Sequence, residues 1–550
     1  MKSSYSTVSQ KLNPIATPQT EPIPGKTMIQ NHAGGYGFEV SIWQRLERFL
    51  ILGSENGNYY IGKLTLTLQN AQNVSECIKV DGKRTVDVIT AISDSGRAAK
   101  NDPALFALAM CASAENLNTR TYALQNLSKI ARIGTHLFHF TEYINNLRGW
   151  SRSLRTAMSN WYLEKPAEKL ALQLTKYQSR DGWSHRDILR LAHPTPKTEA
   201  QRLGFMWSVG LLDKYKDKNS KHFNEELYQT VMGNLVKEMP LIAAYEDMKS
   251  TDDEAMVIHL IKKFQFPLEL VPTEKRTKAV YDAIIPNLKI EALIRELPTL
   301  TRAGVLGDLG NANSDYIVGQ LTNFDTLRRG RVHPFKVLLA LSTYRSGQNF
   351  RGTSSWTPVS KISSALEDAF YLSFGAVEPT NKRIMLALDV SGSMSMGSVL
   401  GSEQLRPCEV TSVMAMVTAR TEKDCMIMGF SDRFKSLNIT SKDSLKEVLH
   451  NVAMQNYGGT DCSLPMNYAR ENKLPVDAFV VYTDNETWAG GNHPIQALKQ
   501  YQQVMGIPAK LISIATSTNH VSIADESSYT TNVCGFDSAA PQIINDFITN

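Results

Sequence analysis

The sequence lacks the usual features of secreted, membrane-spanning and zinc-binding proteins. It has six cysteines in 550 residues, and no two of them stand at a C-x-x-C spacing, which argues against a zinc cluster or a dense disulfide framework. It has no run of about 18 apolar residues, and residues 1–20 contain no apolar core of a signal peptide. We therefore expect a reduced, cytoplasmic protein that acts without a membrane.

Charge is divided unequally along a chain of otherwise ordinary composition. With 42% apolar and 21% charged residues, a chain of 550 residues is long enough for two or more globular domains. Residues 381–550 hold 13 of the 59 basic and 17 of the 54 acidic residues, a net charge of −4, so 46 basic and 37 acidic residues precede them, a net charge of +9. This asymmetry favours an anionic partner for the first part, nucleic acid above all.

The chain up to residue 378 is expected to be a flexible tail followed by helices. Residues 1–35 are rich in Ser, Thr, Pro, Gln and Gly and have no periodic apolar pattern, which is typical of a flexible tail. From residue 36 to 378, apolar residues recur at i, i+3, i+4 and i+7, as in amphipathic helices. Clear examples are residues 102–113, 120–132, 252–264 and 333–346. So many short helices in succession favour a helical-repeat domain, although no strict repeat period is present.

Residues 379–550 predict an α/β domain, so that the whole chain is of the α + α/β class. Apolar strands alternate here with amphipathic helices, which is typical of a doubly wound parallel sheet covered on both faces. The expected strands are 383–390, 425–430, 478–483 and 510–516. The expected helices are 408–420, 442–454, 461–470, 494–505 and 538–548. Ligands of such sheets bind at the carboxyl ends of the strands.

Oxygen-bearing side chains gather at these strand ends. The first strand runs into Asp389, Ser391 and Ser393, a D-x-S-x-S motif, a later loop offers Thr460, and the third strand runs into Asp484. Taken alone, the motif is more typical of ordinary capping residues at a strand–helix junction than of a metal site. The three pieces together predict a site for a hard divalent cation, Mg²⁺ first and Mn²⁺ or Ca²⁺ as alternatives. The absence of His and Cys from the set argues against zinc.

This arrangement resembles the metal-ion-dependent adhesion site of von Willebrand factor A (vWA) domains. The resemblance implies that Ser391 and Ser393 bind the ion directly and that Asp389 and Asp484 bind mainly through water. Thr460 would bind directly or through water. In that family the open coordination position takes a carboxylate from a partner protein. We expect adhesion rather than catalysis, because no base or nucleophile lies beside the site in the sequence.

Two basic stretches are candidates for binding RNA. In residues 176–193, Lys176 and Arg180 have the spacing of one helix face, and the turn at Trp183 opens a helix with His185, Arg186 and Arg190. A second stretch interleaves basic residues with aromatic ones: Arg132, His136, Arg148, Arg152 and Arg155. The alternative is that Trp183 fills a core and the arginines are only solvated. Residues 57–63 fit the G-x-x-x-x-G-K pattern, but Leu64 follows where a P-loop needs Ser or Thr, so we expect no nucleotide site there.

Six segments together resemble the Ro autoantigen family, RNA-binding proteins built from a TROVE module and a vWA domain. They are 132-RIGTHLF-138, 176-KYQSRDGWSHRDILRLAH-193, 333-HPFKVLLAL-341, 381-NKRIMLALDVSGSM-394, 456-NYGGTDCSLPM-466 and 480-VVYTDNETWAGG-491. The resemblance implies a TROVE-like domain over 36–378, a ring of HEAT-type helical repeats that closes near a vWA domain over 379–550. It further implies that the ring binds small noncoding Y-type RNAs outside and the single-stranded 3′ ends of misfolded RNAs in its hole.

The resemblance assigns Y RNA binding to Lys176, Arg180, His185 and Arg186, with His185 first, and gives the stretch from Arg132 to Arg155 a supporting part. Residues 34–37 and 53–62 are closer in character to bacterial members, which cooperate with exoribonucleases. We thus expect a monomeric, non-enzymatic protein of RNA quality control. The competing hypothesis is a metal-dependent protein-adhesion adaptor without RNA. A nuclease is disfavoured because the candidate cluster has only two carboxylates.

Overall fold

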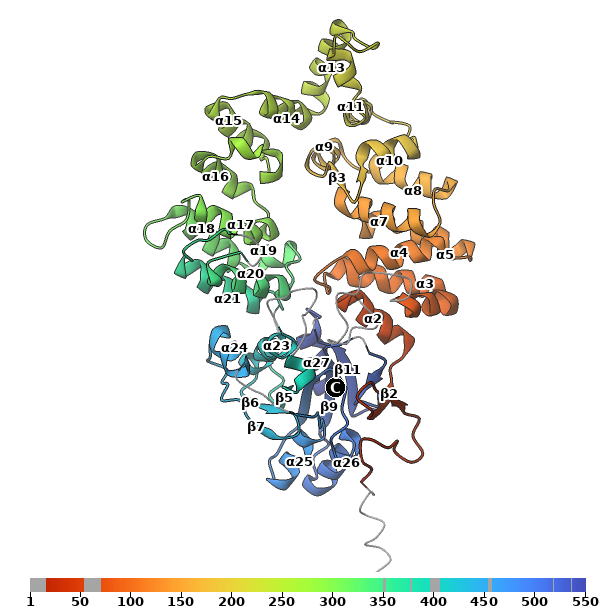
Figure 1. Cartoon of the computed structure of the whole chain (residues 1–550), viewed down its shortest axis with the longest axis vertical. Coiled ribbons are helices and arrows are strands. Elements are labelled where there is room, and N and C mark those ends of the chain that lie inside the picture. Colours follow the sequence, from red (N-terminus) through yellow and green to blue (C-terminus); the bar gives the residue numbers. More distant parts are fainter. Residues whose placement is uncertain are drawn as a thin grey trace, which may run out of the picture.

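The structure, a computed structural model, divides into a helical ring and a sheet domain (Figure 1). It describes residues 16–53, 71–349, 353–375, 378–395, 406–453, 458–517, 519–535 and 537–550. We call the described residues of 36–375 the helical domain and those of 378–550 the sheet domain. The G-x-x-x-x-G-K segment at 57–63 lies outside the described residues.

The helical domain consists of short α-helices joined by brief loops. None of the described helices has both the length and the apolar character needed to cross a membrane. The helices of its first half are α2 (Ile42–Leu52), α3 (Gln72–Ser95), α4 (Asp102–Ser113), α5 (Leu117–Gln125), α6 (Leu127–Ile130), α7 (Gly134–Leu147), α8 (Arg152–Leu163), α9 (Ala167–Lys176), α10 (His185–Ala192) and α11 (Glu199–Ser208). Those of the second half are α12 (Leu211–Lys216), α13 (Glu225–Glu238), α14 (Pro240–Ser250), α15 (Glu254–Phe264), α16 (Lys278–Ile284), α17 (Ile290–Arg302), α18 (Ala312–Leu321), α19 (Phe324–Arg329), α20 (Pro334–Ser346) and α21 (Ser360–Leu372).

Local sequence accounts for where these helices begin and end. Helix α4 covers the predicted range 102–113, with Pro103 in its first turn, where a missing N–H costs nothing. The predicted helix 120–132 is wrong as one piece, because Asn126 ends α5 before α6 begins. The Asn126 side chain donates to the Tyr122 carbonyl at 2.9 Å, a local bond that competes with continuation of the helix.

The helical domain closes on itself next to the sheet domain. In Figure 1 the helices climb one side from α2, cross over at α13 and descend to α21, so that α3 and α20 come near each other. Arg331, after α19, pairs with Asp94 of α3 at 2.8 Å. The Nε2 of His333 donates to the Arg97 carbonyl at 3.0 Å, while its Nδ1 accepts from the Phe335 amide. The predicted ring is therefore confirmed, and polar contacts join its two ends.

The sheet domain contains the predicted parallel sheet. Its six strands lie in the order β11-β9-β8-β5-β6-β7, and only the edge strand β7 is antiparallel. The strands are β5 (Arg383–Asp389), β6 (Asp424–Phe430), β7 (Phe434–Ser436), β8 (Ala478–Thr483), β9 (Lys510–Ala515) and β11 (Thr530–Cys534). The helices are α22 (Gly392–Ser395), α23 (Pro407–Thr421), α24 (Leu445–Ala453), α25 (Leu464–Glu471), α26 (Pro494–Met505) and α27 (Ala540–Thr549).

The two domains share a hydrophobic core. One face of the sheet packs with α23, α24 and α27 in the same apolar cluster as the second half of the ring, from Met248 to Phe374. The other face packs with α25 and α26 in a separate cluster. The first half of the ring has its own core. Continuous apolar packing therefore fixes the sheet domain to the second half of the ring.

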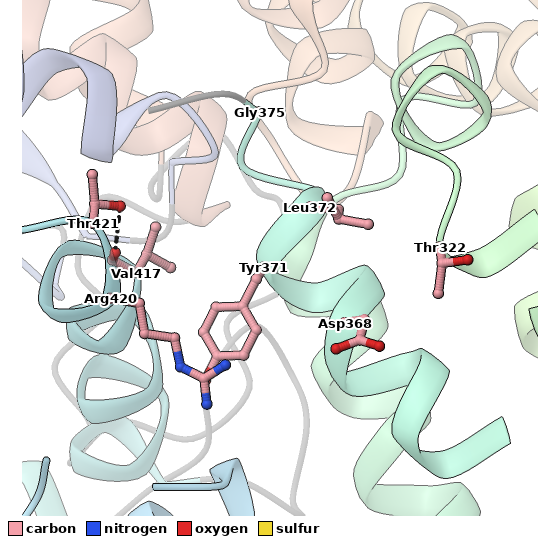
Figure 2. Close-up of a pocket in the computed structure, with 8 residues that line it drawn as sticks. All are labelled: Thr322, Asp368, Tyr371, Leu372, Gly375, Val417, Arg420 and Thr421. Carbon is pink, nitrogen blue, oxygen red and sulfur yellow. Dashed lines mark hydrogen bonds between the residues drawn. The ribbon is translucent and has the colours of Figure 1, made fainter. Parts of the chain in front are cut away.

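A pocket of about 490 Å³ lies where the two domains meet (Figure 2). Its walls come from the last ring helix, α21, and from α23 of the sheet domain. The Arg420 guanidinium lies 3.9 Å from the centroid of the Tyr371 ring and donates to the Asp443 carbonyl at 2.8 Å. This cation–π contact adds a polar link at the edge of the shared core.

The N-terminal segment is not the flexible tail that its composition predicts, at least over residues 16–35. Gln19 is fully buried, and its Nε2 donates to Asp461 at 2.7 Å and to the Asn492 carbonyl at 2.9 Å. Strand β1 (Ile29–Gln30) pairs with β2 (Tyr36–Glu39), which pairs with β10 (Val521–Ser522) of the sheet domain. Polar side chains that suggested disorder are thus satisfied by loops of a distant domain.

Candidate metal centre and nucleic-acid interface

Four of the five predicted metal ligands come together at the carboxyl edge of the sheet, and the fifth, Thr460, lies on a loop bonded to the one after β8. Strand β5 ends at Asp389, and its neighbour β8 ends directly before Asp484, so parallel pairing brings the two carboxylates to one edge. All five side chains lie in buried residues: Asp389, Ser391, Ser393, Thr460 and Asp484. The D-x-S-x-S turn leads from β5 into α22, so both serines follow directly after the strand end.

Hydrogen bonds link these side chains to one another. Asp389 accepts from the Ser391 amide at 2.9 Å and from the Thr483 hydroxyl at 2.7 Å. The Ser391 and Ser393 hydroxyl oxygens are 3.1 Å apart, and Ser393 donates to Asp484. These four side chains are therefore close enough to one another to face a common point.

The loop with Thr460 is held against the loop that follows β8. The Thr460 carbonyl accepts from the Trp488 and Ala489 amides, each at 3.0 Å, so the backbone of Thr460 is fixed. Gly459 lies so close to Trp488 that a Cβ would stand 2.6 Å from its ring, which explains glycine at this position. Within the described residues, the Thr460 hydroxyl has no hydrogen-bond partner and remains available to a ligand.

The electrostatics of the site suit a cation. Burial raises the pKa of Asp389 to about 6, and burial together with the charge of Asp389 raises the pKa of Asp484 to about 7. Among the described residues, no Lys or Arg forms an ion pair with either carboxylate. No cluster of three or more His, Cys, Asp or Glu occurs in the described part of the chain. Two carboxylates among three hydroxyls fit a hard divalent cation and do not fit zinc.

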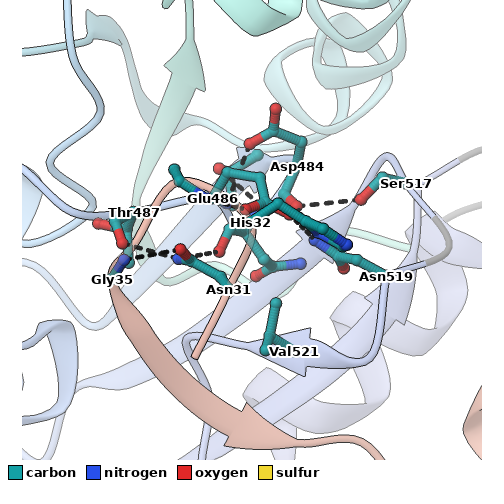
Figure 3. A network of polar contacts seen from close by, with 12 residues as sticks. Asn31, His32, Gly35, Asp484, Glu486, Thr487, Ser517, Asn519 and Val521 are labelled. Atoms are coloured by element: carbon teal, nitrogen blue, oxygen red, sulfur yellow. Dashed lines mark hydrogen bonds and ion pairs between the residues drawn. The ribbon is translucent and has the colours of Figure 1, made fainter. Parts of the chain in front are cut away.

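A network of hydrogen bonds holds the loop at Asp484 in place (Figure 3). The Asp484 carbonyl accepts from Asn519 at 2.6 Å and from the Ser517 hydroxyl at 3.0 Å. Arg48 of α2 donates to the Asn519 carbonyl at 2.8 Å, and His32 contacts Glu486 at 3.1 Å. Sequence reasoning missed these supporting residues, because Arg48 and His32 reach partners more than 450 positions away in the chain.

The predicted RNA-binding residues divide into an exposed and a buried group. Six arginines are exposed, and none of them has an ion-pair partner among the described residues beyond a loose 3.8 Å contact between Arg180 and Asp181. We call them the arginine surface: Arg148, Arg152, Arg155, Arg180, Arg186 and Arg190.

Two tryptophans bring the two basic stretches together. Trp150 precedes the N-cap Ser151 of α8, and Trp183 precedes the N-cap Ser184 of α10. Their ring centroids are 6.2 Å apart, and α8 packs beside α10. In the sequence, the dipeptide Trp-Ser occurs directly before both helices, and this repeat is a signal by which the contact between the two basic stretches could have been found. Trp183 thus contributes to packing, while the arginines of the adjoining helices α8 and α10 stay exposed.

His185, the residue that the sequence favours most for RNA, is a core residue. It is 2% exposed, its Nε2 donates to the Gln173 carbonyl at 3.0 Å, and its Nδ1 accepts from the Tyr162 hydroxyl at 2.8 Å. Burial lowers its pKa to about 4, so the ring is neutral. Both ring nitrogens are occupied, so the structure places His185 in the core instead of on the surface where the sequence suggests direct RNA contact.

Lys176, Arg132 and His136 are also largely engaged within the protein. Lys176 ends α9 and pairs with Glu269 at 3.5 Å, whereas Arg180 lies in β3 (Ser179–Arg180), so the two do not share a helix face as predicted. Arg132 donates to the Ser93 hydroxyl at 3.0 Å and to the Lys129 carbonyl at 3.2 Å. Burial lowers the pKa of His136 to about 3. These three residues stabilise the ring more than they present charge.

Comparison with known proteins finds the same two domains in the same order. The TROVE domain family matches residues 29–351, and the Ro60 vWA domain family matches residues 383–548. The chain is 38% identical over 541 residues to "RNA-binding protein RO60" of Deinococcus radiodurans, covering 98% of each chain. It is 35% identical over 584 residues to "RNA-binding protein RO60" of Caenorhabditis elegans, covering 95% of this chain and 90% of the other.

A solved structure is similar over most of the chain. The crystal structure of the Deinococcus radiodurans RO (RSR) protein has a TM-score of 0.67 and 38% sequence identity, and the match covers 92% of this chain and 99% of that one. The agreement extends across both domains, as the resemblance in the sequence predicts.

Proposed function

The chain belongs to the Ro60 family, whose members join a TROVE domain to a vWA domain, and from this premise we propose that it is a non-enzymatic RNA-binding protein. The relatives from D. radiodurans and C. elegans are both named RNA-binding proteins, which supports the proposal. We propose further that its RNAs are Y-type RNAs and misfolded noncoding RNAs under quality control, in the cytoplasm.

The arginine surface is the observation that carries this proposal. Arginine is strongly suited to phosphate because its guanidinium donates several hydrogen bonds in a fixed plane. Arg152 and Arg155 stand in the first turn of α8, where helix N–H groups also favour an anion and no acidic residue competes. Structured Y-type RNA would bind here on the outside, and single-stranded 3′ ends would enter the ring.

Salt dependence tests whether phosphate contacts supply the affinity. If four or five arginines each neutralise one phosphate, the logarithm of the association constant should fall with log salt at a slope of about −4. Fluorescence anisotropy with a Y-type hairpin between 50 and 300 mM KCl measures this slope. RNA that co-purifies with the protein, detected by a high 260/280 nm absorbance ratio, gives an independent check. A slope near zero, with no co-purifying RNA, favours the protein-adhesion adaptor.

The metal centre is proposed as a docking point rather than a catalytic one. The ion would be Mg²⁺, with Mn²⁺ or Ca²⁺ as alternatives, and its ligands would be Asp389, Ser391, Ser393, Thr460 and Asp484. When bound, the ion would supply positive charge and an open coordination position for a partner's carboxylate, an exoribonuclease being one candidate partner. Asp389 accepts from the Thr483 hydroxyl and Asp484 from that of Ser393, so both carboxylates are engaged within the site.

Thermal stability tests the metal proposal. We expect 5 mM Mg²⁺ to raise the melting temperature by a few degrees, since binding to the folded state stabilises it by RT ln(1 + [Mg²⁺]/Kd). Ser391→Ala should abolish the Mg²⁺-dependent rise, because it removes a ligand. Ser441→Ala, at an exposed site on the same domain, is the matched control and should keep the full rise. An equal rise in both variants would show that Mg²⁺ binds elsewhere.

A further inference from the structure

A pocket opens beside the arginine surface, at the start of α10. It has a volume of about 360 Å³ and is lined by Gly182, Trp183, Asp187, Arg190 and Leu191. Asp187, Arg190 and Leu191 stand at i, i+3 and i+4 of α10 and therefore share one helix face. The turn with Gly182 and Trp183 forms the other wall. The volume is enough for one nucleobase.

The aromatic wall of this pocket is held in place before any ligand binds. The Trp183 indole N–H donates to Glu142 at 2.8 Å, and Trp150 packs against the same ring. Gly182 has φ +79°, and a Cβ on this residue would meet no described atom within 4 Å, so the rim beside the indole is open. A fixed, half-buried indole with an open side is a stacking platform for an unpaired base.

The polar groups of the pocket differ in what they can recognise. One carboxylate oxygen of Asp187, Oδ2, accepts from the Ser184 amide at 3.0 Å and from its hydroxyl at 2.5 Å. The other oxygen, Oδ1, has no partner among the described residues, so it is free to accept a hydrogen bond. Arg190 is exposed and likewise forms no ion pair with a described residue. The lining of the pocket thus offers a carboxylate acceptor and a cation.

We propose that this pocket binds one unpaired adenine of an RNA that is held on the arginine surface. Trp183 stacks on the base, Asp187 accepts from the exocyclic N6 amine, and Arg190 contacts the adjoining phosphate. Uracil and guanine present a carbonyl oxygen at the corresponding edge, which the Asp187 carboxylate repels. Cytosine has the amine but a smaller ring to stack. The inference rests on the proposed RNA binding and adds a base preference to it.

The test compares RNA duplexes that differ in one nucleotide. Full-length protein is titrated at fixed salt into a fluorescein-labelled duplex that is fully paired, or that carries one bulged adenine or one bulged uracil. We expect the adenine bulge to bind roughly tenfold more tightly than the other two, the size expected for one stacked and hydrogen-bonded base. Equal affinity for all three RNAs would overturn the pocket while leaving the proposed function intact. No binding of any RNA would instead contradict the proposed function.

Two substitutions separate stacking from hydrogen bonding. Trp183→Leu should remove the preference, so that the duplex with the bulged adenine and the fully paired duplex bind with an affinity ratio of about 1. Asp187→Asn keeps an oxygen for the Ser184 cap and places an NH₂ donor in the pocket, so the preference should turn from adenine to uracil. Circular dichroism melting shows whether each variant is folded. An adenine preference that survives in the folded Asp187→Asn protein would contradict the contact between Asp187 and the base. A peptide that displaces the adenine-bulge RNA from the pocket would indicate a protein ligand instead.

Discussion

Reversing four charges of the arginine surface is expected to weaken RNA binding by at least roughly 100-fold at 100 mM salt and to lower the salt slope by about one per residue. The variant is Arg152→Glu, Arg155→Glu, Arg186→Glu and Arg190→Glu in one chain. All four side chains are exposed, and none of them has an ion-pair partner among the described residues, so their loss breaks no internal ion pair there. Anisotropy titration with a Y-type hairpin measures the affinity, and circular dichroism checks the fold.

A control with the same change of net charge makes this result specific. Four exposed lysines lie around α12 and α13, at the far end of the ring from the sheet domain (Figure 1): Lys214, Lys218, Lys221 and Lys237. Reversing these four should reduce affinity by a fewfold at most, through long-range repulsion alone, which salt screens. If both quadruple variants lose affinity equally, the arginine surface has no special part in binding.

The fold and the convergence of the candidate metal ligands were predictable because each depends on short stretches of sequence. Apolar strands are legible as continuous runs, and β5, β6, β8 and β9 lie within one or two residues of their predicted ranges. The rule that parallel strands end at one edge then unites Asp389 with Asp484 without further information. The small sheet of β1, β2 and β10 was missed, since strands of two to four residues carry too little pattern to be recognised.

The exposure of the candidate RNA-binding residues was only partly predictable, because sequence does not show which side of a helix is covered. His185 and Arg186 are neighbours, yet one is buried against Tyr162 and the other is exposed. Lys176 similarly depends on Glu269, 93 positions later, for its ion pair. Charge reversal at Lys176 would place two carboxylates together, so its effect on RNA binding would be mixed with an effect on stability. The six exposed arginines avoid this ambiguity.

Removal of the His185 ring is expected to cost about 2–4 kcal/mol of unfolding free energy. His185→Ala leaves the Tyr162 hydroxyl and the Gln173 carbonyl without their partners. It also empties space beside Phe138, whose ring centroid is 4.8 Å from that of His185, and beside Trp161. Urea unfolding followed by circular dichroism measures the loss. His193→Ala, at an exposed position just after α10, is the matched control and should change the free energy little.

His185 should also make the free energy of unfolding fall at acid pH. Because its folded pKa of about 4 lies below the unfolded value of about 6.5, the unfolded chain binds the proton more readily. His185 therefore contributes its full stability above pH 6.5 and loses it progressively as the pH falls toward 4, by roughly 3 kcal/mol in all. His136 acts in the same direction through its pKa of about 3, so His185→Gln should flatten this acid slope in part and not abolish it.

The RNA affinity of a folded His185 variant shows whether this residue only stabilises the fold or also contacts RNA. At pH 7.5 and well below its melting temperature, His185→Gln should bind RNA within about twofold of the unaltered protein, because the side chain is covered by Tyr162 and Gln173. Its affinity should then collapse only where circular dichroism shows unfolding. A tenfold loss in the fully folded variant would mean that RNA binding exposes the histidine, and it would restore the direct contact that the sequence suggests.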